Sequence, residues 1–77
     1  MSSQYRINLE LAGDLDSVAR VITLLRKCRN KVNVKEIHVQ LNGSSTKMVL
    51  LIETSEIEWF VSKLSTIYEV QELFVSS

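Results

Sequence analysis

The chain has 77 residues, its nine basic and nine acidic side chains cancel, and 45% of its residues are apolar. This length allows a single small domain, and the zero net charge gives no field that would attract nucleic acid or an anionic membrane. The longest apolar run, residues 48–52, is far too short to cross a bilayer. The single cysteine excludes an internal disulfide and fits a reducing compartment. We therefore expect one cytoplasmic domain over residues 1–77, ordered over about residues 4–76, with no nucleic-acid or membrane partner.

The first third of the chain is typical of a strand followed by a helix. Residues 5–11 alternate apolar and polar side chains, which predicts a strand with one solvated face. Apolar residues then recur at helical spacing, and this stripe consists of Val18, Val21, Ile22, Leu25 and Cys28. Asp14 is expected to cap the helix, with Asp16 in its first turn, where the helix dipole favours negative charge.

The rest of the chain predicts a hairpin, a second helix and a last strand. Residues 36–41 and 46–53 flank an Asn-Gly turn, which readily takes positive φ. Ser55 is expected to cap the second helix, with Glu58 completing a capping box. The buried stripe of this helix is predicted to contain Ile57, Phe60, Val61, Leu64 and Tyr68. Residues 70–76 form the last strand.

This order of elements predicts an α+β fold, a ferredoxin-like βαββαβ sandwich. Right-handed crossovers give a four-stranded antiparallel sheet with both helices on one face. The hairpin parity puts one set of apolar residues on the helix-covered face, namely Ile37, Val39, Leu41, Met48, Leu50 and Ile52. Val49 and Leu51 then point to the open face, beside His38. Because a strand that is apolar on both faces is usually covered on both, we expect these three residues to contact another chain; two isolated exposed aliphatic side chains are the alternative.

Few residues could carry chemistry. His38 is the only histidine and Cys28 the only cysteine, whereas a metal centre needs three or four ligands. We therefore expect no metal, no cofactor and no catalytic residue, with Cys28 a buried, inert thiol. Trp59 is predicted on the side of the second helix that faces away from its apolar stripe. There it either anchors a partner, as aromatic residues do at interfaces, or lies over the rim of its own domain.

Residues 4–76 as a whole resemble an ACT domain, the small-molecule-sensing module of amino-acid metabolism. The resemblance rests on residues 7–11, the run Ser17-Val18-Ala19-Arg20-Val21, and residues 64–70. More closely, the chain resembles the small regulatory subunit of acetohydroxyacid synthase (acetolactate synthase). This resemblance implies a non-catalytic subunit that binds and activates the large, thiamine-diphosphate-dependent catalytic subunit in branched-chain amino-acid biosynthesis. It also implies a homodimer or higher oligomer formed through sheet edges, with the second strand as the natural candidate, because an edge strand offers unpaired N–H and C=O groups.

The resemblance further implies an effector loop, whose residues here are Gly13, Asp14, Leu15, Asp16, Ser17, Lys31 and Val32. Effector-binding members carry glycine at the position of Asp16, so that a ligand carboxylate can approach the helix N-terminus. An aspartate fills this space and repels a carboxylate, and Lys31 replaces a small polar residue. We therefore expect the valine-insensitive type of subunit.

Two other readings remain open at this point. One is a free-standing ACT-type module that binds a small amino acid or drives oligomerisation. The other is an enzyme of the same topology, such as an acylphosphatase-like hydrolase. The second is disfavoured because that chemistry needs a glycine-rich anion loop with an arginine, whereas the loop here carries Asp14 and Asp16.

Overall fold

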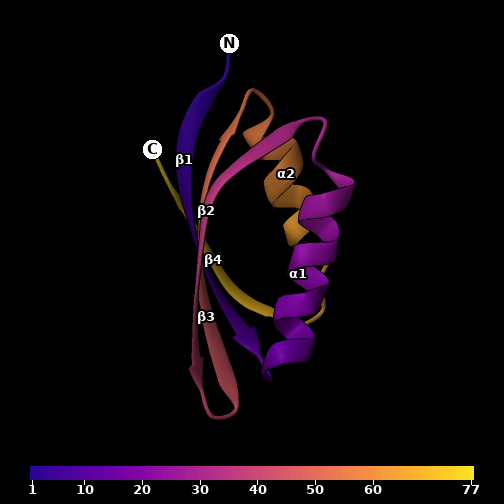
Figure 1. Ribbon diagram of the computed structural model, residues 1–77, viewed down its shortest axis with the longest axis vertical. Helices are drawn as coiled ribbons and strands as arrows, with labels where there is room; N and C mark the ends of the chain where they lie inside the picture. The colour runs from indigo at the N-terminus through magenta and orange to yellow at the C-terminus, as the bar shows by residue number, and fades with distance from the viewer.

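Two helices pack on one side of a four-stranded sheet and leave its other side open (Figure 1). The computed structural model describes all 77 residues. Its elements in chain order are β1 (Ser3–Ala12), α1 (Leu15–Lys27), β2 (Val32–Asn42), β3 (Ser45–Thr54), α2 (Ile57–Leu64) and β4 (Val70–Ser76). The predicted ferredoxin-like βαββαβ sandwich is confirmed. Neither helix has the length and apolar character needed to cross a membrane.

The sheet has the strand order β2-β3-β1-β4, and every pair of neighbouring strands is antiparallel. β1 and β3 are therefore central, whereas β2 and β4 each leave one edge unpaired. The predicted second strand starts earlier than its alternation suggested, at Val32, with a register shift between Val34 and Glu36. Both chain termini lie at the end of the sheet that is opposite the β2–β3 hairpin (Figure 1).

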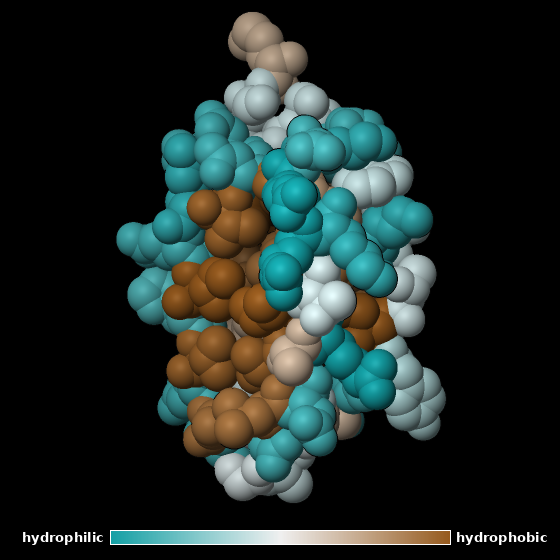
Figure 2. Space-filling model, turned by 45° about the vertical axis from the view of Figure 1, so that its right-hand side comes forward, coloured by the Kyte–Doolittle hydropathy of each residue, from teal (hydrophilic) through white to brown (hydrophobic).

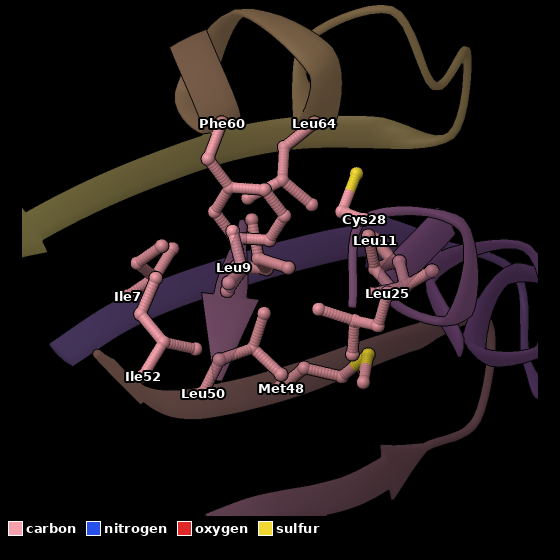
Figure 3. Packing of buried hydrophobic residues seen from close by; sticks show 12 residues of the cluster. Ile7, Leu9, Leu11, Leu25, Cys28, Met48, Leu50, Ile52, Phe60 and Leu64 are labelled. Carbon is pink, nitrogen blue, oxygen red and sulfur yellow. The ribbon is translucent and has the colours of Figure 1, made fainter. Parts of the chain in front are cut away.

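The core lies between the helices and the helix-facing side of the sheet. Phe60 and Leu64 of α2 point down onto the side chains of β1 and β3, and Leu25 of α1 packs beside them (Figure 3). The buried hydrophobic residues are Ile7, Leu9, Leu11, Val21, Leu25, Cys28, Val32, Met48, Leu50, Ile52, Phe60 and Leu64. Every buried side-chain nitrogen and oxygen has a hydrogen-bond partner, so the core leaves no polar group uncompensated.

The two helices begin in different ways. Asp14 is the N-cap of α1, as predicted, and its carboxylate accepts from the backbone N–H of Asp16. The capping box predicted for α2 does not form, because its N-cap is Glu56, which makes no side-chain cap bond. Instead, the Glu56 N–H donates to Oγ1 of Thr54 (3.0 Å), and that hydroxyl donates to the Lys31 carbonyl oxygen (2.8 Å). A long-range tether thus replaces the local motif.

The prediction of a buried Tyr68 is wrong. α2 ends at Leu64, and the turn that follows redirects the chain before the helical period reaches this residue. Tyr68 is 96% exposed.

The apolar side chains of β2 lie on the predicted face but are not covered there. Ile37 is directly opposite Leu50, and Val39 is opposite Met48, so both share the helix-facing side of the sheet. Ile37, Val39 and Leu41 are nevertheless 39%, 44% and 50% exposed. The expectation of a helix-covered row is therefore wrong for this strand. The helices cover the central strands and leave the outer half of β2 open.

Candidate functional site

Several hydrogen bonds hold the loop from Gly13 to Ser17, which joins β1 to α1. Gly13 has φ of +88°, its N–H donates to the Ser44 carbonyl (2.8 Å), and its own carbonyl accepts from Oγ1 of Thr46 (2.9 Å). The buried Ser17 hydroxyl donates to the Ala12 carbonyl. These bonds tie the loop to the β2–β3 hairpin and fix where α1 begins.

The acidic residues of the predicted effector loop stand at the N-terminus of α1. Asp14 caps the helix, and Asp16 is an exposed residue of its first turn. Leu15, the first residue of α1, is 64% exposed. The geometry thus puts a carboxylate at the helix end where the resemblance implies an effector, and the prediction that Asp16 excludes such a ligand stays a prediction.

Lys31 and Val32 lie at the opposite end of α1. A helix of 13 residues separates them from the first loop, which corresponds to about 20 Å at 1.5 Å per residue. Val32 is buried in the core, and Nζ of Lys31 lies 3.9 Å from Oε1 of Glu56. Within one chain, therefore, the structure does not bring the two parts of the predicted effector loop together.

Trp59 covers part of the rim of its own domain. It is half-buried and packs against the core cluster. Nζ of Lys31 lies 4.4 Å from the centroid of its ring and Nζ of Lys63 lies 5.7 Å from it, both within cation–π range. A role for Trp59 at an interface stays a prediction.

The open face of the sheet carries the other predicted contact residues. His38 lies opposite Val49, and Glu36 lies opposite Leu51. Val49 and Leu51 point to this face, as predicted, and are half-buried there. Nε2 of the exposed His38 lies 3.2 Å from Oε2 of Glu36.

This face also holds a shallow hollow of about 380 Å³. It crosses all four strands and is lined by Asn8, Leu9, Glu10, His38, Val39, Gln40, Lys47, Met48, Val49, Glu72 and Phe74. Phe74, whose direction the sequence does not give, lies opposite Asn8 and is 63% exposed.

A second surface runs along the outer edge of β2, the edge at which the resemblance implies pairing between copies; its exposed apolar row was not predicted. Figure 2 shows a hydrophobic band that runs lengthwise over this part of the molecule. The exposed large residues of β2 here are Ile37, Val39 and Leu41, and half-buried Ile22 of α1 lines a hollow together with Ile37. The strand order of the predicted fold could have indicated this exposure, because the second strand of this topology is an edge strand.

The chain brings together no group of three or more His, Cys, Asp or Glu side chains that could hold a metal ion. Cys28 is a free, buried thiol at the C-cap of α1. The candidate site consists of two surfaces, the β2 edge and the open sheet face, together with the first loop.

No protein-family model matches the chain, and no curated protein matches its sequence. Solved structures do match its fold. The crystal structure of the ACT domain from GTP pyrophosphokinase of Chlorobium tepidum superposes with a TM-score of 0.82 at 11% identity. That match covers 99% of this chain and 100% of the other.

Two further structures are similar. The solution structure of the C-terminal domain of the MgtC protein from Mycobacterium tuberculosis has a TM-score of 0.69 at 13% identity, covering 95% of this chain and 84% of that one. Formyltetrahydrofolate deformylase from Burkholderia mallei has a TM-score of 0.76 at 16% identity, covering 97% of this chain but only 28% of its own length. At these identities the likeness establishes an ACT-like fold.

Proposed function

We propose that this chain is a non-catalytic regulatory module that acts as a dimer of two copies. By its resemblance to the small regulatory subunit of acetolactate synthase, we further propose that it binds and activates the large catalytic subunit of that enzyme. The ACT fold is typically regulatory rather than catalytic. The observation that carries the proposal is the outer edge of β2, where an exposed apolar row adjoins unpaired backbone groups.

The β2 edge has two properties of a pairing surface. Its only neighbour in the sheet is β3, so the N–H and C=O groups on its outer side are free to pair with another strand. Next to them, Ile37, Val39 and Leu41 expose apolar area that a monomer would leave in water. A contiguous apolar patch of this kind usually marks an interaction site.

A second copy of the same chain fits this edge. A two-fold axis perpendicular to the sheet lets β2 pair with itself in antiparallel fashion, which is an isologous contact. The same axis would run the two α1 helices antiparallel across the seam. Asp14 and Asp16 at the start of one helix would then approach Arg26 and Arg29 at the end of the other. The surface is thus complementary to itself in charge as well as in hydrophobicity.

Such a dimer would also complete the effector loop. Gly13 is bonded to Ser44 at the hairpin end of β2. In an antiparallel pair, that end lies beside the beginning of β2 in the second copy, where Lys31 and Val32 are found. The two parts that lie about 20 Å apart within one chain would meet across the seam, with Asp16 among them.

The dimer is tested with a matched pair of variants, Val39→Lys and Val75→Lys. Both valines lie on the helix-facing side of an edge strand, at 44% and 40% exposure, but Val75 belongs to β4. We expect sedimentation equilibrium to show self-association weakened at least tenfold by Val39→Lys and unchanged by Val75→Lys. Equal behaviour of the two variants would contradict pairing through β2.

The partner is tested with purified large catalytic subunit of acetolactate synthase from the same genome. We expect a stoichiometric complex in a pull-down, a raised rate of pyruvate condensation, and no loss of that rate when valine is added. An intact dimer that forms no complex and changes no rate would favour the free-standing ACT-type module for amino-acid binding or oligomerisation.

A further inference from the structure

We infer that the open face of the sheet is a second self-association surface, on which two copies of the chain stack face to face. This interface is separate from the β2 edge and does not depend on it. The register of the four strands fixes where each open-face side chain lies relative to the others.

The register arranges the open face in rows that cross the sheet from β2 to β4. The first row consists of Glu36, Leu51, Arg6 and Ser76. The second consists of His38, Val49, Asn8 and Phe74. The third consists of Gln40, Lys47, Glu10 and Glu72. The hollow on this face lies over the second and third rows.

The charges in these rows are incompletely satisfied within one chain. Arg6, Glu10, Lys47 and Glu72 form none of the ion pairs that lie within 4.0 Å. Glu10 and Glu72 are directly opposite each other on neighbouring strands, an arrangement of like charges that costs stability. The exposed ring of Phe74 stands in the adjacent row. A face of this composition gains from a partner that supplies opposite charge and apolar contact.

A second copy supplies both. Consider a two-fold axis parallel to the strands, between β3 and β1, that brings two open faces together. It keeps each row in register with itself and reverses the order of the strands. In the third row, Lys47 of each copy then faces Glu10 of the other, which makes two equivalent ion pairs. An isologous contact requires this kind of self-complementarity.

The other two rows are compatible with the same axis. His38 faces Phe74 of the second copy, and Leu51 faces the aliphatic stem of Arg6. The guanidinium of that Arg6 can reach Glu36, one strand further on, since neighbouring strands are about 4.8 Å apart. No residue of these rows faces a like charge across the seam. Aligned sheets pack at about 30° to each other, which displaces the corners of the face more than its centre.

The test exchanges charge between two chains. Glu10→Lys gives one chain two cations at these positions, and Lys47→Glu gives another chain two anions. Each variant repels its own copy across the proposed seam, whereas a mixture of the two restores attraction. Placing like charges on neighbouring strands destabilises each chain only slightly, and circular dichroism verifies the fold.

Native mass spectrometry and sedimentation velocity supply the readout. We expect the wild-type chain to form assemblies larger than a dimer through both surfaces, each single variant to stop at a dimer, and the equimolar mixture to regain the larger assemblies. If the Val39→Lys variant is a dimer and the double variant Val39→Lys/Lys47→Glu is a monomer, the face contact is supported even if β2 pairing fails. The proposal is overturned if the single charge variants assemble like wild type or if their mixture stays at the dimer. It is also overturned if wild type is no larger than a dimer and Val39→Lys alone makes it a monomer.

Discussion

Oγ1 of Thr46 donates a hydrogen bond of 2.9 Å to the carbonyl oxygen of Gly13, across 33 residues of sequence. Thr46 is fully buried in β3, and Gly13 begins the loop that leads into α1. The bond therefore holds the predicted effector loop against the sheet.

Removing this hydroxyl should loosen the loop. We expect Thr46→Val, which keeps the shape of the side chain, to lower the free energy of unfolding by about 1–3 kcal/mol, because a carbonyl loses its partner. Urea denaturation followed by circular dichroism measures the change. Thr23→Val is the control, since that exposed hydroxyl bonds only to Ala19 within α1. Equal losses for the two variants would contradict a special role for the Thr46 bond.

The two glycines should respond differently to alanine. Both have positive φ, +88° at Gly13 and +66° at Gly43, and a side chain in this region costs about 1–2 kcal/mol. A Cβ at Gly13 would also lie 3.1 Å from Oγ of Ser17, whereas at Gly43 it meets nothing within 4 Å. We therefore expect Gly13→Ala to lower the melting temperature more than Gly43→Ala.

The crowding at Gly13 has its own control. Ser17→Ala removes the atom that the new Cβ would meet, so the double variant Gly13→Ala/Ser17→Ala should lose less stability than the two single losses added together. Simple additivity in a double-mutant cycle would assign the whole cost at Gly13 to its backbone conformation.

Phe60 and Tyr68 form a matched pair of aromatic residues with opposite surroundings. Phe60 is fully buried, and Tyr68 is almost fully exposed. We expect Phe60→Ala to cost about 3–5 kcal/mol through the cavity that it leaves, and Tyr68→Ala to change stability by less than about 0.5 kcal/mol. Urea denaturation tests both. If Phe60→Ala leaves no folded chain, Phe60→Leu provides a smaller loss to measure, and a stable Phe60→Ala would refute the described core.

Asp16 should keep amino acids out of the first loop. We expect calorimetry to detect no valine binding to the wild-type chain and to detect binding to Asp16→Gly, which removes both the bulk and the charge at the N-terminus of α1. Asp16→Asn keeps the bulk and removes the charge, so it separates the two causes. Tight binding of valine by the wild-type chain would refute this role for Asp16.

Much of the fold follows from local patterns. The alternation of residues 5–11 identified β1, and its register with β3 confirms which of its side chains are buried. Asp14 was identified as a cap, and Gly43 takes the positive φ that its turn signal indicated. These features depend on neighbouring residues alone, so the sequence contains enough information to predict them.

The predictions that the structure contradicts concern features that depend on residues distant in the sequence. Periodicity predicts the face of the sheet on which Val39 lies. Whether a helix covers Val39 depends on the lateral position of α1, whose Val21 and Leu25 pack into the core. The pattern around Ser55 is typical of a cap, yet the N-cap is Glu56, whose N–H donates to the Thr54 hydroxyl, and that hydroxyl is also bonded to the loop after α1. The predicted effector loop combines residues 13–17 with Lys31 and Val32, which lie at opposite ends of α1. These two segments can meet only if a second chain contributes one of them.

The position of the chain ends has a practical consequence. β1 and β4 run side by side, with Arg6 opposite Ser76, so both ends emerge together, away from the hairpin and the first loop (Figure 1). A fluorophore or an affinity handle fused at either end would project from the pole remote from Gly13. Labelled chains can therefore report assembly by energy transfer while each label stays distant from the first loop of its own chain.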